Sequence, residues 1–168
     1  NKCLDLALLA PNSSNMQPWE FYWVRSKEKR EKLTHLCLNQ NTVKTAAEMI
    51  VVVSRTDTWK RNSKLMLKEL KQQEVEAPKS AIQYYSKITP LANKSTALAC
   101  ENLMLAFRAY GYDTCPIEGL DQRRIRRMLK LPYGKAEVCM AISVGKRGEN
   151  GIYGPRIRFD RSLFVKEV

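Results

Sequence analysis

Short polar side chains crowd one loop near the start of the chain, where two prolines, two asparagines, two serines and a glutamine fall within residues 10–21. Proline fixes φ, and the side chains of asparagine, serine and glutamine both donate and accept hydrogen bonds. A rigid loop of this composition can bind a polar ligand without using charge. The same residue types also make an ordinary turn between a helix and a strand, so composition alone leaves both interpretations open.

A single histidine, His35, and five widely spaced cysteines limit the other chemistry that side chains could perform. One histidine gives weak support to Ser-His-Asp or Cys-His catalysis and excludes a metal site with two histidine ligands. No cysteine pair has C-x-x-C spacing, which argues against a zinc site and a disulfide framework and favours a reducing compartment. Cys100 and Cys139 lie in apolar runs and are predicted to be inert core residues.

The net charge is +12, from 29 basic and 17 acidic residues among 168. Such a charge fits nucleic acid, an anionic membrane surface or small phosphate-bearing ligands. The basic residues gather in two helical segments, 60–71 and 123–130, without interleaved aromatic residues or a known nucleic-acid-binding motif. We therefore expect solvated helix faces rather than a nucleic-acid partner.

Length and composition favour a single domain over residues 1–168, with enough apolar residues for a core. No apolar run approaches the ~20 residues that a membrane span needs, so no membrane partner is expected. No signal peptide is visible at the start of the sequence, which predicts a cytoplasmic protein.

Hydrophobic spacing predicts a mixture of long helices and few strands. Helices are expected at residues 2–10, 27–38, 41–47, 58–76, 94–110 and, after an Asp121 N-cap, up to Pro132. Strands are expected at residues 20–25, 49–54, 136–144 and 162–168. Residues 58–91 form a charged excursion in which 77–91 are predicted to be a mobile lid.

The segment 94–110 is apolar nearly all round, with Gly111 placed as its C-terminal cap. A helix of this kind is buried on most faces, either as the spine of the domain or as part of a dimer interface. No regular alternation of strands and helices and no G-x-G-x-x-G motif occurs, so a dinucleotide-binding doubly wound sheet is not expected. The fold class is predicted to be α+β.

Two motifs together resemble the flavin-contacting segments of the FMN-dependent nitroreductase family. The first is the pattern Pro-x-Ser-x-Asn-x-Gln-Pro-Trp over residues 11–19, and the second is Pro-Ile-Glu-Gly over residues 116–119. The resemblance extends over almost the whole order of expected elements. It implies a small antiparallel sheet sandwiched by helices, an intertwined homodimer, and two FMN molecules bound at the subunit interface.

The resemblance also implies roles for individual residues. In the first loop, the residues that reach the flavin, from the neighbouring subunit, are Pro11, Asn12, Ser13 and Asn15. Gln17 is similar to a buried glutamine that fixes this loop, and Trp19 is expected in the core. Asn41 and Lys44 resemble a pair beside the pyrimidine edge of the flavin, where an ammonium group favours the negative charge of reduction.

The second motif resembles a segment along the other face of the flavin, formed by Pro116, Ile117, Glu118 and Gly119. The backbone N–H of Glu118 would donate to flavin N5, and Gly119 would allow close approach of the backbone. Arg156 and Arg158 are similar to two basic residues that bind the FMN phosphate. The tail 162–168 resembles a strand added to the partner subunit.

The activity implied is transfer of hydride from NADH or NADPH to nitroaromatic, quinone or flavin acceptors in a ping-pong mechanism. An Arg-x-Ser-x-Arg motif that the family has before its first helix is absent here, and we expect it to precede Asn1 in the full protein. Two alternatives remain open at this point. One is a flavin-binding or storage protein without turnover, and the other is a basic nucleic-acid-binding protein.

Overall fold

Four antiparallel strands form the central sheet of the computed structural model, in the order β1-β2-β4-β3. Their bounds are Trp19–Trp23 for β1, Glu48–Arg55 for β2, Asp113–Ile117 for β3 and Ala136–Gly145 for β4. The structure describes residues 1–72, 89–149, 151, 154 and 157–167. The predicted lid at 77–91 therefore lies almost entirely outside the described residues.

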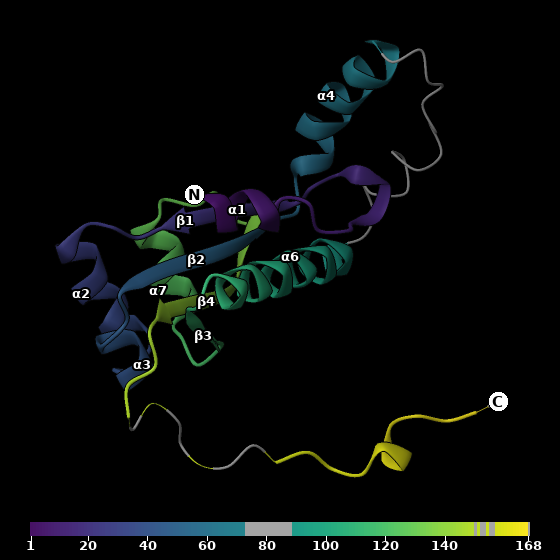
Figure 1. The fold of residues 1–168 in the computed structure, drawn as a ribbon. Helices are drawn as coiled ribbons and strands as arrows, with labels where there is room; N and C mark the ends of the chain where they lie inside the picture. Colours follow the sequence, from purple (N-terminus) through teal and green to yellow (C-terminus); the bar gives the residue numbers. More distant parts are fainter. Residues whose placement is uncertain (73–88, 150, 152–153, 155–156, 168) are drawn as a thin grey trace.

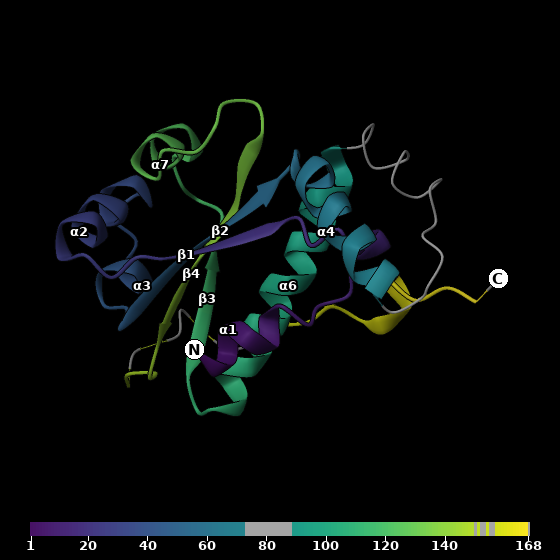
Figure 2. The ribbon, with the colours of Figure 1, turned by 90° about the horizontal axis from the view of Figure 1, so that it is seen from above.

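Helices cover both faces of the sheet (Figures 1 and 2). One face packs against α2, α3 and α7, and the other packs against α1 and α6. The helices span Lys2–Ala7 (α1), Lys27–Leu36 (α2), Asn41–Lys44 (α3), Thr58–Gln72 (α4), Thr89–Ala109 (α6) and Gln122–Met128 (α7). The predicted α+β class, with a small antiparallel sheet between helices, is confirmed.

The central strand β2 is buried on both faces, as its run of apolar residues predicts. Met49, Val51 and Val53 point into the core beneath α2 and α7, whereas Ile50 and Val52 point into the core beneath α6. The strand therefore joins the two halves of the core, and its two ends fix where the loops on either side emerge.

A β-bulge interrupts the pairing of β2 with β4. Val52 pairs with Met140 but Val53 pairs with Val138, so Cys139 is the additional residue. Both Cys139 and Met140 consequently pack against the core beneath α6, whereas in a regular strand neighbouring side chains alternate between faces. The bulge thus brings the Cys139 side chain to the α6 side of the sheet.

Helix α6 is the longest helix described, and it presents two different apolar faces. Cys100 and Leu103 are fully buried against the sheet. Leu98 and Leu105, two turns apart on another face, are 47% and 59% exposed. The expectation that this helix is buried on most faces therefore does not hold within one chain, because an apolar stripe stays uncovered.

Truncating Leu103 to alanine tests the importance of the α6 core. Leu103 is completely buried beneath the sheet, so the substitution leaves a cavity. We expect a loss of about 2–5 kcal/mol in the free energy of unfolding, measured by chemical denaturation. The matched variant Leu105→Ala, at an exposed position of the same helix, should cost much less if a single chain is measured.

Two segments differ from prediction in their type of secondary structure. Strand β3 was not expected, because its five residues are only partly buried and include Pro116. As the edge strand of the sheet it tolerates a proline, which cannot donate a ladder hydrogen bond. The predicted strand at 162–168 is wrong for its described part: Arg161–Leu163 form a 3₁₀ turn, and residues 164–167 belong to no strand.

Local signals at helix ends agree better with the structure. The Asp121 side chain accepts a hydrogen bond from the Arg124 N–H at 2.9 Å and so caps α7, as predicted. Gly111 adopts φ of +80° directly after α6, which a capping glycine does readily. Helix α1 ends at Ala7 rather than at residue 10. No helix in the described ranges is long and apolar enough to span a membrane.

Candidate functional site

The polar loop before β1 is organised by its own side chains. Asn12 Oδ1 accepts a hydrogen bond from the Gln17 N–H at 2.8 Å, and Gln17 Nε2 donates to Asn15 Oδ1 at 3.1 Å. Asn15 and Gln17 have φ of +50° and +46°, in the left-handed region that side chains rarely adopt. These bonds hold a strained turn in which Pro11, Ser13 and Asn15 are exposed.

Gln17 does not have the buried position that was expected of it. Its side chain is exposed, and the fully buried residue of this loop is its neighbour Met16. The loop is also held from α4, since Asn62 Nδ2 donates to the Met16 carbonyl at 2.7 Å. No pattern in the sequence distinguishes Asn62 from the other polar residues of this charged helix. Trp19, with 6% exposure, lies in the core as predicted.

Asn41 and Lys44 lie one turn apart on the short helix α3, which directly precedes β2. Both side chains are exposed, while Val43 between them is buried and fixes the helix to the core. No ion pair of the described residues involves Lys44. The amide and the ammonium group are therefore available to an anionic or hydrogen-bonding ligand.

The Pro-Ile-Glu-Gly segment contacts the residue directly before α3, although Gln40 and Gly119 are 79 positions apart in the sequence. Gln40 Nε2, just before α3, donates to the Gly119 carbonyl at 2.8 Å. A Cβ atom on Gly119 would lie 3.2 Å from the same Gln40 nitrogen, so glycine permits this close contact. The structure thus brings together two of the predicted segments. Gln40 was missed because its partner is distant in sequence.

The backbone around Glu118 is accessible. Pro116, Glu118 and Gly119 are exposed, and the buried Ile117 fixes the segment in the core. Among the described residues the Glu118 carbonyl accepts from the Leu120 N–H, but the Glu118 N–H is not found to donate to any group. An exposed backbone donor of this kind can bind a ligand acceptor.

The polar loop and α3 lie at opposite ends of β2. Trp19, which follows the loop, pairs with Ser54 near the end of β2, whereas α3 leads into Glu48 at its start. The six residue steps between these positions span roughly 20 Å. Within one chain the loop therefore does not meet Asn41 or Lys44.

The basic tail is placed away from all of these segments (Figure 1). Every described residue from 157 to 167 is exposed, including Phe159 and Phe164 at 73% and 70%. The Arg158 guanidinium donates to the neighbouring Ile157 carbonyl at 2.7 Å, so it is not gathered with Asn41 and Lys44. Arg156 lies outside the described residues.

An ion-pair cluster stabilises the end of β2 beside the polar loop. The Arg55 guanidinium binds Glu20 Oε1 at 2.7 Å and Asp57 Oδ1 at 2.9 Å, and the Arg55 N–H donates to the Pro18 carbonyl. The hydrogen bond and charge of Arg55 lower the pKa of Asp57 below its ordinary value of 3.8, although partial burial opposes this.

This cluster predicts acid-sensitive stability. Because the pKa of Asp57 is lower in the folded chain than in the unfolded chain, the carboxylate stabilises the fold fully at pH values above the ordinary pKa of 3.8. This stabilisation is lost as the pH falls below 3.8 and through the lower pKa of the folded state. We expect Asp57→Asn to lower the melting temperature at pH 7 and the deficit to shrink towards pH 3. Glu31→Gln, at an exposed carboxylate of α2 that lies in no ion pair among the described residues, is the matched control. An equal deficit for Asp57→Asn at both pH values would contradict this prediction.

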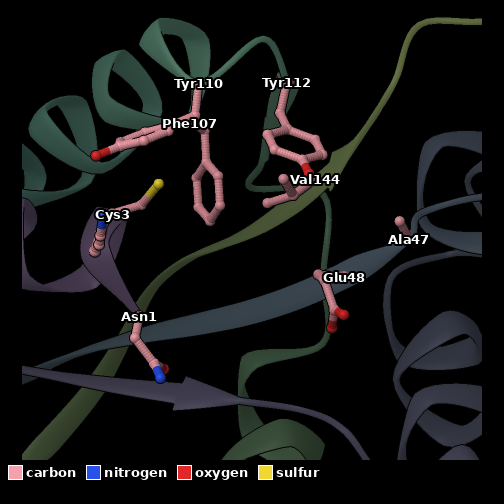
Figure 3. A pocket seen from close by; sticks show the side chains of 9 residues that line it. Asn1, Cys3, Ala47, Glu48, Phe107, Tyr110, Tyr112 and Val144 are labelled. Carbon is pink, nitrogen blue, oxygen red and sulfur yellow. The ribbon is translucent and has the colours of Figure 1, made fainter.

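A pocket of about 420 Å³ lies on the α1–α6 side of the sheet, separate from these predicted residues. Figure 3 shows Phe107 and Tyr112 close together at the end of α6, with Glu48 across from them. The pocket is lined by Asn1, Lys2, Cys3, Ala47, Glu48, Phe107, Tyr110, Tyr112 and Val144. None of the residues predicted to contact flavin lines it. No cluster of potential metal ligands is found in the described part of the chain.

Comparisons with known proteins find a family model and several relatives that are similar to this chain. A sequence model of the nitroreductase family matches residues 1–146. The Bacillus subtilis protein YdgI, named as a candidate NAD(P)H nitroreductase, is 31% identical over 172 residues, covering 94% of this chain and 81% of YdgI. Protein DrgA of Synechocystis is 29% identical over 154 residues, covering 89% of this chain and 73% of DrgA.

A solved structure with a similar fold contains a flavin. It is a candidate nitroreductase from Exiguobacterium sibiricum, crystallised in complex with FMN. The two chains are 26% identical and superpose with a TM-score of 0.85, over 99% of this chain and 84% of the other.

Proposed function

Because the chain belongs to the nitroreductase family, we propose that it is an FMN-dependent NAD(P)H oxidoreductase that works as a homodimer. The observation that supports this proposal most directly is the bond between Gln40 and Gly119. It links Gln40, the residue directly before Asn41, to Gly119 of the 116–119 segment. The segments 41–44 and 116–119 both resemble flavin-contacting segments of the family.

The groups at this position suit the polar edge of a flavin. Lys44 offers a positive charge, Asn41 a donor and an acceptor, and Glu118 a backbone donor, while the exposed Pro116 offers an apolar surface. The missing side chain at Gly119 lets the backbone approach a ligand as closely as it approaches Gln40. Arg156 and Arg158 are proposed to bind the FMN phosphate through bidentate guanidinium contacts.

When bound, FMN supplies the hydride chemistry, accepting hydride from NADH or NADPH and passing it to an acceptor. The residues of the chain would then bind the flavin, orient it and tune its reduction. The Glu118 N–H fixes the reactive edge, and the Lys44 ammonium stabilises the negative charge that reduction creates. No acid–base pair is required. We propose nitroaromatic, quinone or flavin acceptors and a ping-pong mechanism, in which both substrates use the same face in turn.

The homodimer proposal follows from the positions of the loop and the tail. The loop at one end of β2 cannot reach a flavin beside α3 at the other end, so Pro11, Asn12, Ser13 and Asn15 must come from a second copy. The exposed Leu98 and Leu105 on α6 and the exposed phenylalanines of the tail supply apolar surface for such a contact. A closed two-fold dimer would then contain two equivalent sites.

The visible absorption spectrum of the purified protein, followed by anaerobic addition of NADH or NADPH, tests the proposed function. We expect a flavin spectrum that bleaches on addition and recovers with a quinone or nitroaromatic acceptor. A spectrum that stays oxidised would indicate a flavin-binding protein without turnover. A colourless protein that takes up no FMN would reject the proposal, and salt-dependent binding to nucleic acid would then be measured.

A further inference from the structure

The β-bulge in β4 places one cysteine opposite another. Cys139, the additional residue of the bulge, packs against the core beneath α6, where Cys100 of α6 is fully buried. Both side chains belong to the packed cluster beneath α6, where the two thiols interact with each other. They belong to different elements and are separated by 38 residues of sequence, so the fold alone brings them together.

The Cys139 thiol is partly accessible to solvent and lies near polar groups. Its side chain is partly exposed, whereas Cys100 is not. Ser54, which pairs with Glu137 on the neighbouring strand, is fully buried, and its hydroxyl lies beside the Cys139 thiol. Asn93 of α6 donates to Glu137 at 2.9 Å. A partly exposed thiol beside polar groups is a better nucleophile than one in an apolar core.

Cys37 shows what an inert thiol of this chain looks like. It is fully buried between α2 and the sheet, and burial raises its pKa to about 11. In contrast, the hydrogen bond from Cys100 lowers the pKa of Cys139 despite its burial, and that same bond raises the pKa of Cys100. One thiolate of the pair is therefore stabilised by the proton of the other.

We propose that Cys100 and Cys139 form a redox-active dithiol that hydrogen peroxide oxidises to a disulfide. The Cys139 thiolate attacks one peroxide oxygen, giving a sulfenic acid and releasing hydroxide, which leaves as water. Cys100 then loses its proton, attacks the Cys139 sulfur and displaces a second hydroxide, which takes up that proton. The two thiols lose two electrons in total, and the peroxide is reduced to two molecules of water.

The disulfide would connect α6 to the central strand β4. It would close a long loop that contains β3 and α7, and so restrict the unfolded chain. We expect oxidation to raise the melting temperature by about 5–10 °C. Neither thiol is among the residues proposed to contact flavin, although the nearby charge of Glu118 acts to raise the pKa of Cys139. The linkage is detected in the chain itself, so its failure is distinguishable from failure of the proposed function.

Intact-protein mass spectrometry after treatment of the full chain with hydrogen peroxide tests the proposal. We expect a loss of two hydrogen atoms, a fall in alkylatable thiols under denaturing conditions from five to three, and a linked peptide that contains Cys100 and Cys139. Dithiothreitol should reverse all three changes. Cys139→Ser and Cys100→Ser should each abolish the linked peptide, whereas the matched variant Cys37→Ser should retain it.

Three results would overturn the proposal. They are a linkage that involves Cys3, Cys37 or Cys115 instead, irreversible oxidation of Cys139 without a linkage, and no linkage under conditions that already oxidise the partly exposed methionines. The linked peptide is sought in the unmodified chain, so the proposal stays testable even if a cysteine variant fails to fold. The thermal shift should disappear in Cys139→Ser, which separates the effect of the linkage from other effects of peroxide.

Discussion

Replacing Lys44 with methionine is expected to lower kcat/KM for NAD(P)H oxidation about 100-fold. Lys44 is exposed on α3 and lies in no ion pair among the described residues, and Gln40, which directly precedes α3, binds Gly119. Its charge would act where reduction adds negative charge. Methionine keeps the length of the side chain and removes the charge, so packing around Val43 should not change.

Stopped-flow reduction of the bound flavin and the flavin reduction potential provide the measurements. We expect slower reduction and a more negative potential, with little change in the melting temperature. Lys29→Met is the matched control, because Lys29 is exposed in the first turn of α2, at the opposite end of that helix from α3. Unchanged flavin potential and rate in Lys44→Met would show that Lys44 does not face the flavin.

Replacing Leu105 with glutamate is expected to dissociate the dimer and to weaken FMN binding at least 100-fold. Leu105 is 59% exposed in the single chain and belongs to the uncovered stripe of α6. A charge in the centre of an apolar interface without a partner is costly. Dissociation would also remove the polar loop of the second copy from the flavin, because that loop and α3 lie at opposite ends of β2.

Sedimentation velocity and the ratio of flavin to protein measure the two effects separately. Tyr133→Glu is the matched control, because Tyr133 is 94% exposed and lies after α7, on the other side of the sheet from α6. A monomer that retains FMN would show that one chain completes the site. A dimer that persists would show that Leu105 lies outside the interface.

The elements that the sequence predicts best are those whose signal is local. The apolar run of β2, the alternation in β4 and the Asp121 cap of α7 depend on neighbouring residues alone, and the structure confirms them. Strand β3 was missed because it is a short edge strand that contains a proline. The tail 162–168 was read as a strand from its apolar residues, but a strand needs a partner, and one chain supplies none to the described residues.

In the candidate site, too, local motifs could be predicted from the sequence and long-range contacts could not. The motifs at 41–44 and 116–119 could be located from sequence, but their contact depends on Gln40, whose side chain has no distinguishing pattern. The burial expected for Gln17 was wrong, since it depends on what covers the loop and the single chain leaves it exposed. The role proposed for Arg158 stays a prediction, because the tail does not reach α3 within one chain.

The separation of the polar loop and α3 along β2 has a consequence for inheritance. In the proposed dimer each site takes its loop from one copy and its Lys44 from the other, so no site belongs to one polypeptide. Two alleles that are each inactive, one altered in the loop and one at Lys44, would therefore complement one another when expressed together. Random pairing would leave about a quarter of all sites intact. The length of β2 thus makes the dimer, rather than the chain, the genetic unit of activity.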